Sequence, residues 1–126
     1  MKGSVMSDKK VLICDDDEGI LDMLGLILSD SGYQTIPVQN SLQIYEEIKR
    51  EKPDLVLLDL WMPVLSGDQV LRTLRKSPET ENLRVIVISA SREGERIATE
   101  AGADGFLAKP FDLEQLISRV EQVIAA

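Results

Sequence analysis

Short apolar runs alternate with amphipathic segments along the chain, and this alternation constrains the fold more than any other feature. Three of the runs are continuously apolar and contain β-branched residues: 11–14, 55–58 and 85–88. Runs of this kind are typical of parallel strands that are covered on both faces. Two weaker runs, 33–38 and 106–108, complete a set of five predicted strands.

Between the runs, apolar residues recur at the spacing of a helix. Gly32 can end the first predicted helix in the left-handed conformation, and Pro53 stops the second. Asp112 can cap the fifth, with Gln115 at the capping-box position. The five apolar stripes are Ile20, Leu21, Leu24, Ile27 and Leu28; Leu42, Tyr45 and Ile48; Val70, Leu71 and Leu74; Ile97, Ala98 and Ala101; and Leu113, Leu116, Ile117, Val120 and Ile124.

Strict alternation of five strands and five helices predicts an α/β fold, with a parallel sheet, right-handed crossovers and helices on both faces. The pattern alone does not fix the order of the strands. The length of 126 residues suits one domain. We expect this domain to span residues 8–126, and residues 1–7 to form a tail of the kind that expression cloning can introduce.

The chain contains no histidine. Ser-His-Asp and Cys-His catalytic sites and histidine-rich zinc or iron sites are therefore excluded. The glycine-rich phosphate loops GxGxxG and GxxxxGK(S/T) do not occur in the sequence. A net charge of −8 argues against direct contact with nucleic acid. Any chemistry must come from carboxylates, hydroxyls, lysine or a hard metal ion.

The sequence has no apolar run long enough to span a membrane and no signal peptide. Cys14 is the single cysteine, so the chain cannot form an internal disulfide. These features predict a cytoplasmic protein that does not contact a membrane.

Polar residues follow four of the predicted strands, where ligands bind in open α/β sheets. Asp15 and Asp16 follow the first strand, Asp59 the third, Ser89 the fourth and Lys109 the fifth. Each has a structural alternative. An acidic run usually caps the next helix, a lone serine is usually a satisfied core hydroxyl, and a lone lysine is usually solvated.

Three carboxylates that lie close together resist ionising together, and a divalent cation resolves this repulsion. A site with only a few oxygen ligands from the protein, completed by several waters, favours Mg²⁺. One aspartate remains to attack phosphorus and form an aspartyl-phosphate. The metal, Lys109 and Ser89 would then stabilise the charge of the transferring group.

The chain resembles the receiver domain of two-component response regulators. The resemblance extends over residues 8–125 and rests on four segments in order: VLICDDDEGI, PDLVLLDLWMPVLSG, VIVISAS and AGADGFLAKPF. It implies a flavodoxin-like fold with strand order 2-1-3-4-5. It also implies that Asp59 is the phosphoacceptor, Asp16 a direct Mg²⁺ ligand and Asp15 a ligand through water. The backbone carbonyl of Trp61 would be a further ligand.

The resemblance assigns roles around the phosphoryl group as well. Ser89 matches the hydroxyl residue that moves with the phosphoryl group, and Lys109 matches the lysine that pairs with it. The resemblance also implies that the bond between Lys109 and Pro110 is cis. Phe106 matches the aromatic switch residue, with a core aromatic as the alternative. We expect the fourth helix to respond, because its apolar stripe is weak and Gly94 lowers its helix propensity.

Some residues depart from the commonest family pattern. Val64 and Ser66 replace a frequent Gly and Asp, Ser89 replaces a commoner Thr, and Phe106 replaces a frequent Tyr. None of these changes removes a chemical role.

The implied phosphodonor is a phosphohistidine on a histidine kinase or a histidine phosphotransfer protein. An output domain or a second copy would dock on the fourth helix, fifth strand and fifth helix. The chain would assist its own phosphorylation and dephosphorylation without being a turnover enzyme. Two alternatives stay open: a phosphate-independent interaction module and a magnesium-dependent phosphohydrolase with an aspartate nucleophile. The hydrolase usually needs a second carboxylate close after the nucleophile, where this chain has Trp61.

Overall fold

Five parallel strands form one sheet in the computed structural model, which describes residues 9–126. Their order is β2-β1-β3-β4-β5, as the resemblance implies. The expected tail of residues 1–7 lies outside the described residues. The strands are β1 (Lys10–Cys14), β2 (Gln34–Val38), β3 (Leu55–Asp59), β4 (Arg84–Ser89) and β5 (Gly105–Ala108).

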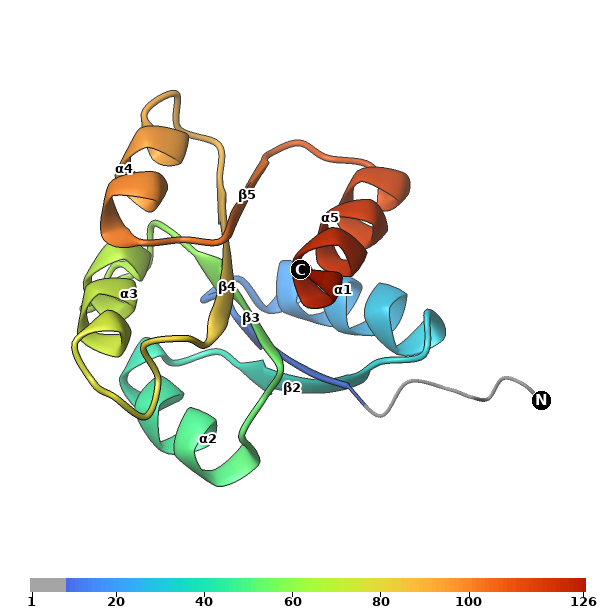
Figure 1. Cartoon of the computed structure of the whole chain (residues 1–126). Coiled ribbons are helices and arrows are strands. Elements are labelled where there is room, and N and C mark those ends of the chain that lie inside the picture. Colours follow the sequence, from blue (N-terminus) through green and yellow to red (C-terminus); the bar gives the residue numbers. More distant parts are fainter. Residues whose placement is uncertain (1–8) are drawn as a thin grey trace.

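Helices cover both faces of the sheet (Figure 1). One buried apolar cluster joins the sheet to α2, α3 and α4, and a second joins it to α1 and α5. No helix in the described part of the chain is long and apolar enough to cross a membrane. The helices are α1 (Glu18–Asp30), a 3-10 turn η1 (Ser41–Gln43), α2 (Ile44–Glu51), α3 (Gly67–Arg75), α4 (Gly94–Ala101) and α5 (Leu113–Ala125).

The predicted helix ends are confirmed, whereas two apolar positions differ from the prediction. Gly32 follows α1 with φ of 99°, and the Asp112 carboxylate accepts the N–H of Gln115 in a capping box. Leu42 was expected on the stripe of the second helix. It lies instead in η1 with 56% of its surface exposed, because α2 begins only at Ile44. Leu113, the first residue of α5, is also exposed.

The register of the strands aligns the residues at their carboxyl ends. Cys14 lies opposite Leu58, so the next residues, Asp15 and Asp59, are neighbours at the carboxyl edge of the sheet. On the other side of β3, Asp59 lies opposite Ile88, the residue before Ser89. Four strands therefore deliver polar side chains to one place, since Lys109 follows the strand that pairs with Ser89.

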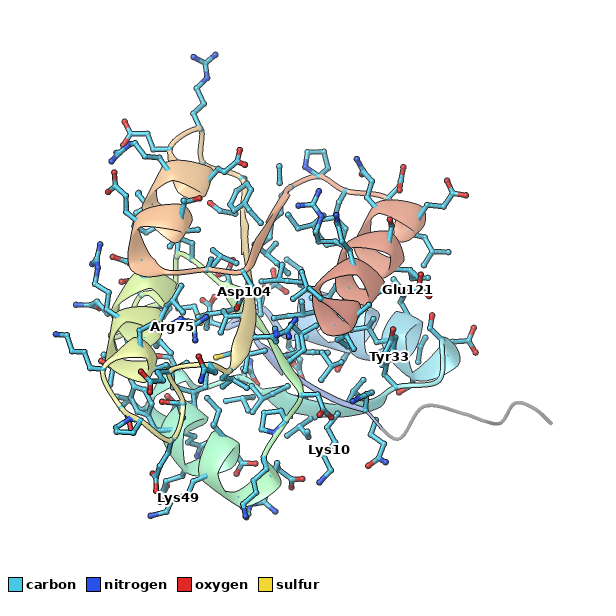
Figure 2. The ribbon with its side chains drawn as sticks, viewed as in Figure 1. Lys10, Tyr33, Lys49, Arg75, Asp104 and Glu121 are labelled. Carbon is cyan, nitrogen blue, oxygen red and sulfur yellow. The ribbon has the colours of Figure 1, made fainter. Side chains whose placement is uncertain are left out.

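An arginine joins several elements at the opposite, amino-terminal edge of the sheet. The Arg75 guanidinium donates to the carbonyls of Leu83 (2.7 Å) and Gly102 (3.0 Å), and its Nη2 lies 2.9 Å from Asp104 Oδ2 (Figure 2). The same Asp104 oxygen accepts the N–H of Val85 at 2.8 Å. The C-terminal ends of α3 and α4 are thereby tied to the start of β4.

Candidate functional site

The centre of the site is a buried carboxylate beside an ammonium group. Asp59 ends β3 with only 6% of its surface exposed, because the strand is apolar and covered on both faces. Lys109 Nζ donates to Asp59 Oδ1 at 3.1 Å. Lys109 reaches this position from the residue after β5, where its bond to Pro110 is cis.

Asp15 is the second buried carboxylate of the site and has 2% of its surface exposed. Its Oδ1 accepts the backbone N–H of Asp17 at 2.9 Å. Its Oδ2 has no hydrogen-bond partner within residues 9–126, although Lys109 Nζ lies 3.8 Å away. A buried carboxylate oxygen without a hydrogen bond costs free energy, so this atom is available to a ligand.

One oxygen each of Asp15, Asp16 and Asp59 lie within 4.8 Å of one another. Burial, and then the charge of Asp15, raises the pKa of Asp59 to about 6, although Lys109 lowers it in part. Burial also raises the pKa of Asp15. The single ammonium group does not compensate the carboxylates fully. Hard oxygen ligands in this arrangement, together with the unbonded Oδ2 of Asp15, fit a divalent cation.

The next residue of the acidic run has a structural role. Asp17 is the N-cap of α1, and its Oδ1 accepts the backbone N–H groups of Gly19 (2.9 Å) and Ile20 (3.2 Å). The capping alternative is therefore right for Asp17. Asp16 is exposed and is not the N-cap of α1, so it remains a member of the acidic cluster with Asp15 and Asp59.

The loop between β3 and α3 borders the site. Trp61 lies two residues after Asp59 with 55% of its surface exposed, so its indole is open to solvent. Val64 has a left-handed φ of 72°, an uncommon conformation for a β-branched residue. Gly67 begins α3 against the backbone of Asp59, and its N–H donates to the Leu60 carbonyl at 2.7 Å. The sequence motif contained Gly67, but no local pattern revealed this contact.

Ser89 lies beneath the start of α4 and is 1% exposed. Its hydroxyl oxygen accepts the N–H of Ser91 at 3.0 Å. Phe106 is half-buried and packs against the apolar cluster on the α2, α3 and α4 face. Gly94, the first residue of α4, lies between these two side chains. The sequence predicted only that Gly94 weakens the helix, because its contacts with Ser89 and Phe106 arise from the packing of α4 on the sheet.

The environment of the thiol next to the site favours its protonated form. Burial, followed by the charges of Asp15 and Asp59, raises the pKa of Cys14 to about 12. The Cys14 sulfur lies 3.7 Å from the sulfur of Met62.

Comparison with known proteins agrees with this geometry. The family model for the response regulator receiver domain matches residues 11–121. The chain is 36% identical over 121 residues to sporulation initiation phosphotransferase F of Bacillus subtilis (strain 168), covering 94% of this chain and 96% of that protein. It is 33% identical over 121 residues to the phosphate regulon transcriptional regulatory protein PhoB of Pseudomonas aeruginosa, covering 94% of this chain and 53% of that protein. It therefore spans nearly all of the first relative and about half of the second.

Solved structures show the same fold. The receiver domain of the Francisella response regulator 1452 superposes with a TM-score of 0.85 at 31% identity, covering 94% of this chain and 98% of that one.

Proposed function

The chain belongs to the response regulator receiver domain family, whose members are phosphorylation-activated signalling switches, and we propose that Asp59 accepts the phosphoryl group. The observation that carries this proposal is the Lys109 ammonium 3.1 Å from the buried Asp59 carboxylate, inside a cluster of three aspartates. A carboxylate with a pKa of about 6 is mostly ionised at neutral pH and can attack phosphorus.

In the proposed reaction, an oxygen of Asp59 attacks the phosphorus of a phosphohistidine on a histidine kinase or a histidine phosphotransfer protein. The P–O bond to Asp59 forms as the P–N bond of the donor breaks, and the electron pair of that bond stays on the imidazole nitrogen. Lys109 orients Asp59 and offsets the phosphoryl charge, while the Ser89 hydroxyl turns to donate to a phosphoryl oxygen. Water later hydrolyses the acyl phosphate. In this proposal the chain assists its own phosphorylation and its own dephosphorylation, and it acts on no external metabolite.

We propose that Asp15, Asp16 and Asp59 hold Mg²⁺, together with the backbone carbonyl of Trp61. The close carboxylates and the unbonded Asp15 Oδ2 support this assignment. When bound, the ion would neutralise charge on the phosphoryl oxygens. Lys109 donates to Asp59 Oδ1 and keeps its carboxylate in place.

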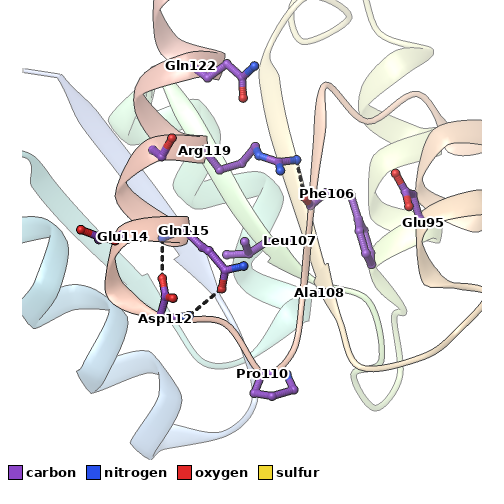
Figure 3. Close-up of a pocket in the computed structure, with 11 residues that line it drawn as sticks. Glu95, Phe106, Leu107, Ala108, Pro110, Asp112, Glu114, Gln115, Arg119 and Gln122 are labelled. Carbon is purple, nitrogen blue, oxygen red and sulfur yellow. Dashed lines mark hydrogen bonds between the residues drawn. The ribbon is translucent and has the colours of Figure 1, made fainter.

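The output surface that we propose is formed by α4, β5 and α5. Phe106 lies on β5, within this surface. Movement of Ser89 toward the phosphoryl group would free space into which the Phe106 side chain could move. A hollow of about 590 Å³ lies here, lined by Glu95, Phe106, Gln115 and Arg119 among others (Figure 3). Arg119 donates to the Phe106 carbonyl at 2.7 Å, so a shift of β5 reaches α5 directly. An output domain or a second copy would dock on this surface.

Phosphorylation by a small donor tests the assignment of Asp59. After incubation with acetyl phosphate and Mg²⁺, intact-mass measurement should show one added phosphoryl group on the wild type and none on Asp59→Asn. The matched control is Asp54→Asn, outside the acidic cluster, which should be labelled like the wild type. Equal labelling of Asp59→Asn would refute the assignment, and an unlabelled wild type would favour a phosphate-independent module.

A further inference from the structure

The position of Gly94 has no room for a side chain. A Cβ built on it would lie 2.9 Å from both Cβ and Oγ of Ser89, and 3.2 Å from Cε1 of Phe106. Its φ lies outside the left-handed region, so the backbone does not require glycine. Glycine is required here only because the space between the side chains of Ser89 and Phe106 is too small for a Cβ. These are the two side chains that move in the proposed switch.

The contact with Ser89 cannot be relieved by a side-chain rotation. The Ser89 hydroxyl can turn away, but its Cβ is fixed to β4, whose Ile88 and Ser89 are almost fully buried. A methyl group at position 94 would therefore push the first turn of α4 off the sheet. Overpacking of this kind is destabilising unless the backbone moves.

The loop before α4 joins Ser89 to this first turn. Ser89 Oγ accepts the N–H of Ser91, and the Ser91 carbonyl accepts the N–H of Gly94 at 3.1 Å. The opposite end of the helix is held separately, because Arg75 donates to the carbonyl of Gly102. A movement of Ser89 should therefore be transmitted to the start of α4, while its last turn stays in place.

We propose that Gly94 is a positioning residue of the switch: its missing side chain lets α4 begin in direct contact with Ser89 and Phe106. This inference rests on the proposed function, since it names the element that reports a change at Ser89. Any larger residue at position 94 should separate α4 from the site, so that a movement of Ser89 no longer reaches the start of α4.

Hydrogen exchange of Gly94–Ala101 tests this inference, first without any ligand. Exchange at the start of α4 should be about tenfold faster in Gly94→Ala than in the wild type, because the helix no longer seats on β4. Gly25→Ala is the matched control, since it is the same substitution within α1 and its Cβ meets only Thr35 Oγ1 at 3.9 Å. It should leave exchange in α4 unchanged.

Beryllofluoride with Mg²⁺, a phosphoryl mimic, then tests the coupling. It should alter exchange at the start of α4 in the wild type and add little in Gly94→Ala. Intact-mass labelling should still show a phosphoryl group on Asp59 in both proteins. A failure of labelling in the wild type would count against the proposed function alone, because the ligand-free comparison does not depend on phosphorylation.

A second variant identifies the cause. Ser89→Gly removes both 2.9 Å contacts, so adding Gly94→Ala to it should change exchange in α4 far less than in the wild-type background. The same rescue should restore folding if Gly94→Ala alone does not fold. Wild-type exchange in Gly94→Ala, an equal increase in both backgrounds, or a double variant that also fails to fold would overturn the proposal.

Discussion

Gly67 lies so close to Asp59 that a Cβ on the glycine would be 2.5 Å from the Asp59 carbonyl oxygen and 2.9 Å from the Leu60 Cα. These are backbone atoms, which cannot rotate away as a side chain can. The first residue of α3 therefore packs directly against the end of β3, at the backbone that carries the Asp59 carboxylate. Gly94 has the corresponding position at the start of α4, above Ser89.

Replacing Gly67 with alanine should displace Asp59. The added methyl group must separate α3 from β3, so we expect the free energy of unfolding to fall by about 1–3 kcal/mol. Phosphorylation by acetyl phosphate should slow in parallel, because Asp59 no longer faces Lys109. Urea unfolding and intact-mass time courses measure the two effects, and Gly25→Ala is the control. Wild-type stability and labelling in Gly67→Ala would show that the site does not depend on this contact.

The sequence predicted the strands, most helix ends and the gathering of site residues, because these follow from apolar periodicity and from the parallel sheet. Asp15, Asp59 and Lys109 meet because each lies at the carboxyl end of a strand of the same sheet. The order of the strands came from the family resemblance, since periodicity carries no information about which strands are neighbours.

The remaining features depend on how the helices and loops pack in the folded chain, which apolar periodicity does not encode. The tight fits of Gly67 and Gly94 arise only when α3 and α4 pack on the sheet. The apolar stripe included Leu42, but the late start of α2 leaves this residue exposed. Likewise, only the folded chain shows that Asp15 Oδ2 has no hydrogen bond within the described residues.

Magnesium should stabilise the chain through the three aspartates. At ten times its dissociation constant it should add about 1.4 kcal/mol to the free energy of unfolding. Asp16→Asn should reduce the increase in melting temperature at a fixed Mg²⁺ concentration, because it removes one ligand. Asp22→Asn, on the exposed side of α1, is the control. Equal increases in the wild type and Asp16→Asn would exclude Asp16 as a ligand.

The stability of the metal-free chain should fall as the pH rises. The pKa of Asp59 is about 6 in the folded chain, mainly because of burial, against 3.8 for an ordinary aspartate. The proton therefore binds the folded state more tightly. Its stabilising contribution is complete below the ordinary pKa and is lost as the pH rises through about 6. That loss should be of the order of 2 kcal/mol between about pH 4 and pH 7.

Chemical unfolding in EDTA at several pH values tests this dependence. Asp59→Asn cannot lose this proton, so its stability should fall less over the same range and exceed that of the wild type at neutral pH. Asp22→Asn should follow the wild type. Parallel curves for the wild type and Asp59→Asn would show that ionised Asp59 carries no such cost.

Arg75 should stabilise the fold without affecting the phosphorylation chemistry, because it lies at the opposite edge of the sheet from Asp59. Arg75→Met leaves the carbonyls of Leu83 and Gly102 without the guanidinium donor, and removes the ion pair with Asp104. We expect a loss of about 2 kcal/mol or more in the free energy of unfolding. Arg72→Met removes only the exposed pair with Asp68 and should cost less than about 1 kcal/mol. Both variants should be labelled by acetyl phosphate at the wild-type rate, and slower labelling of Arg75→Met alone would show that the two edges are coupled.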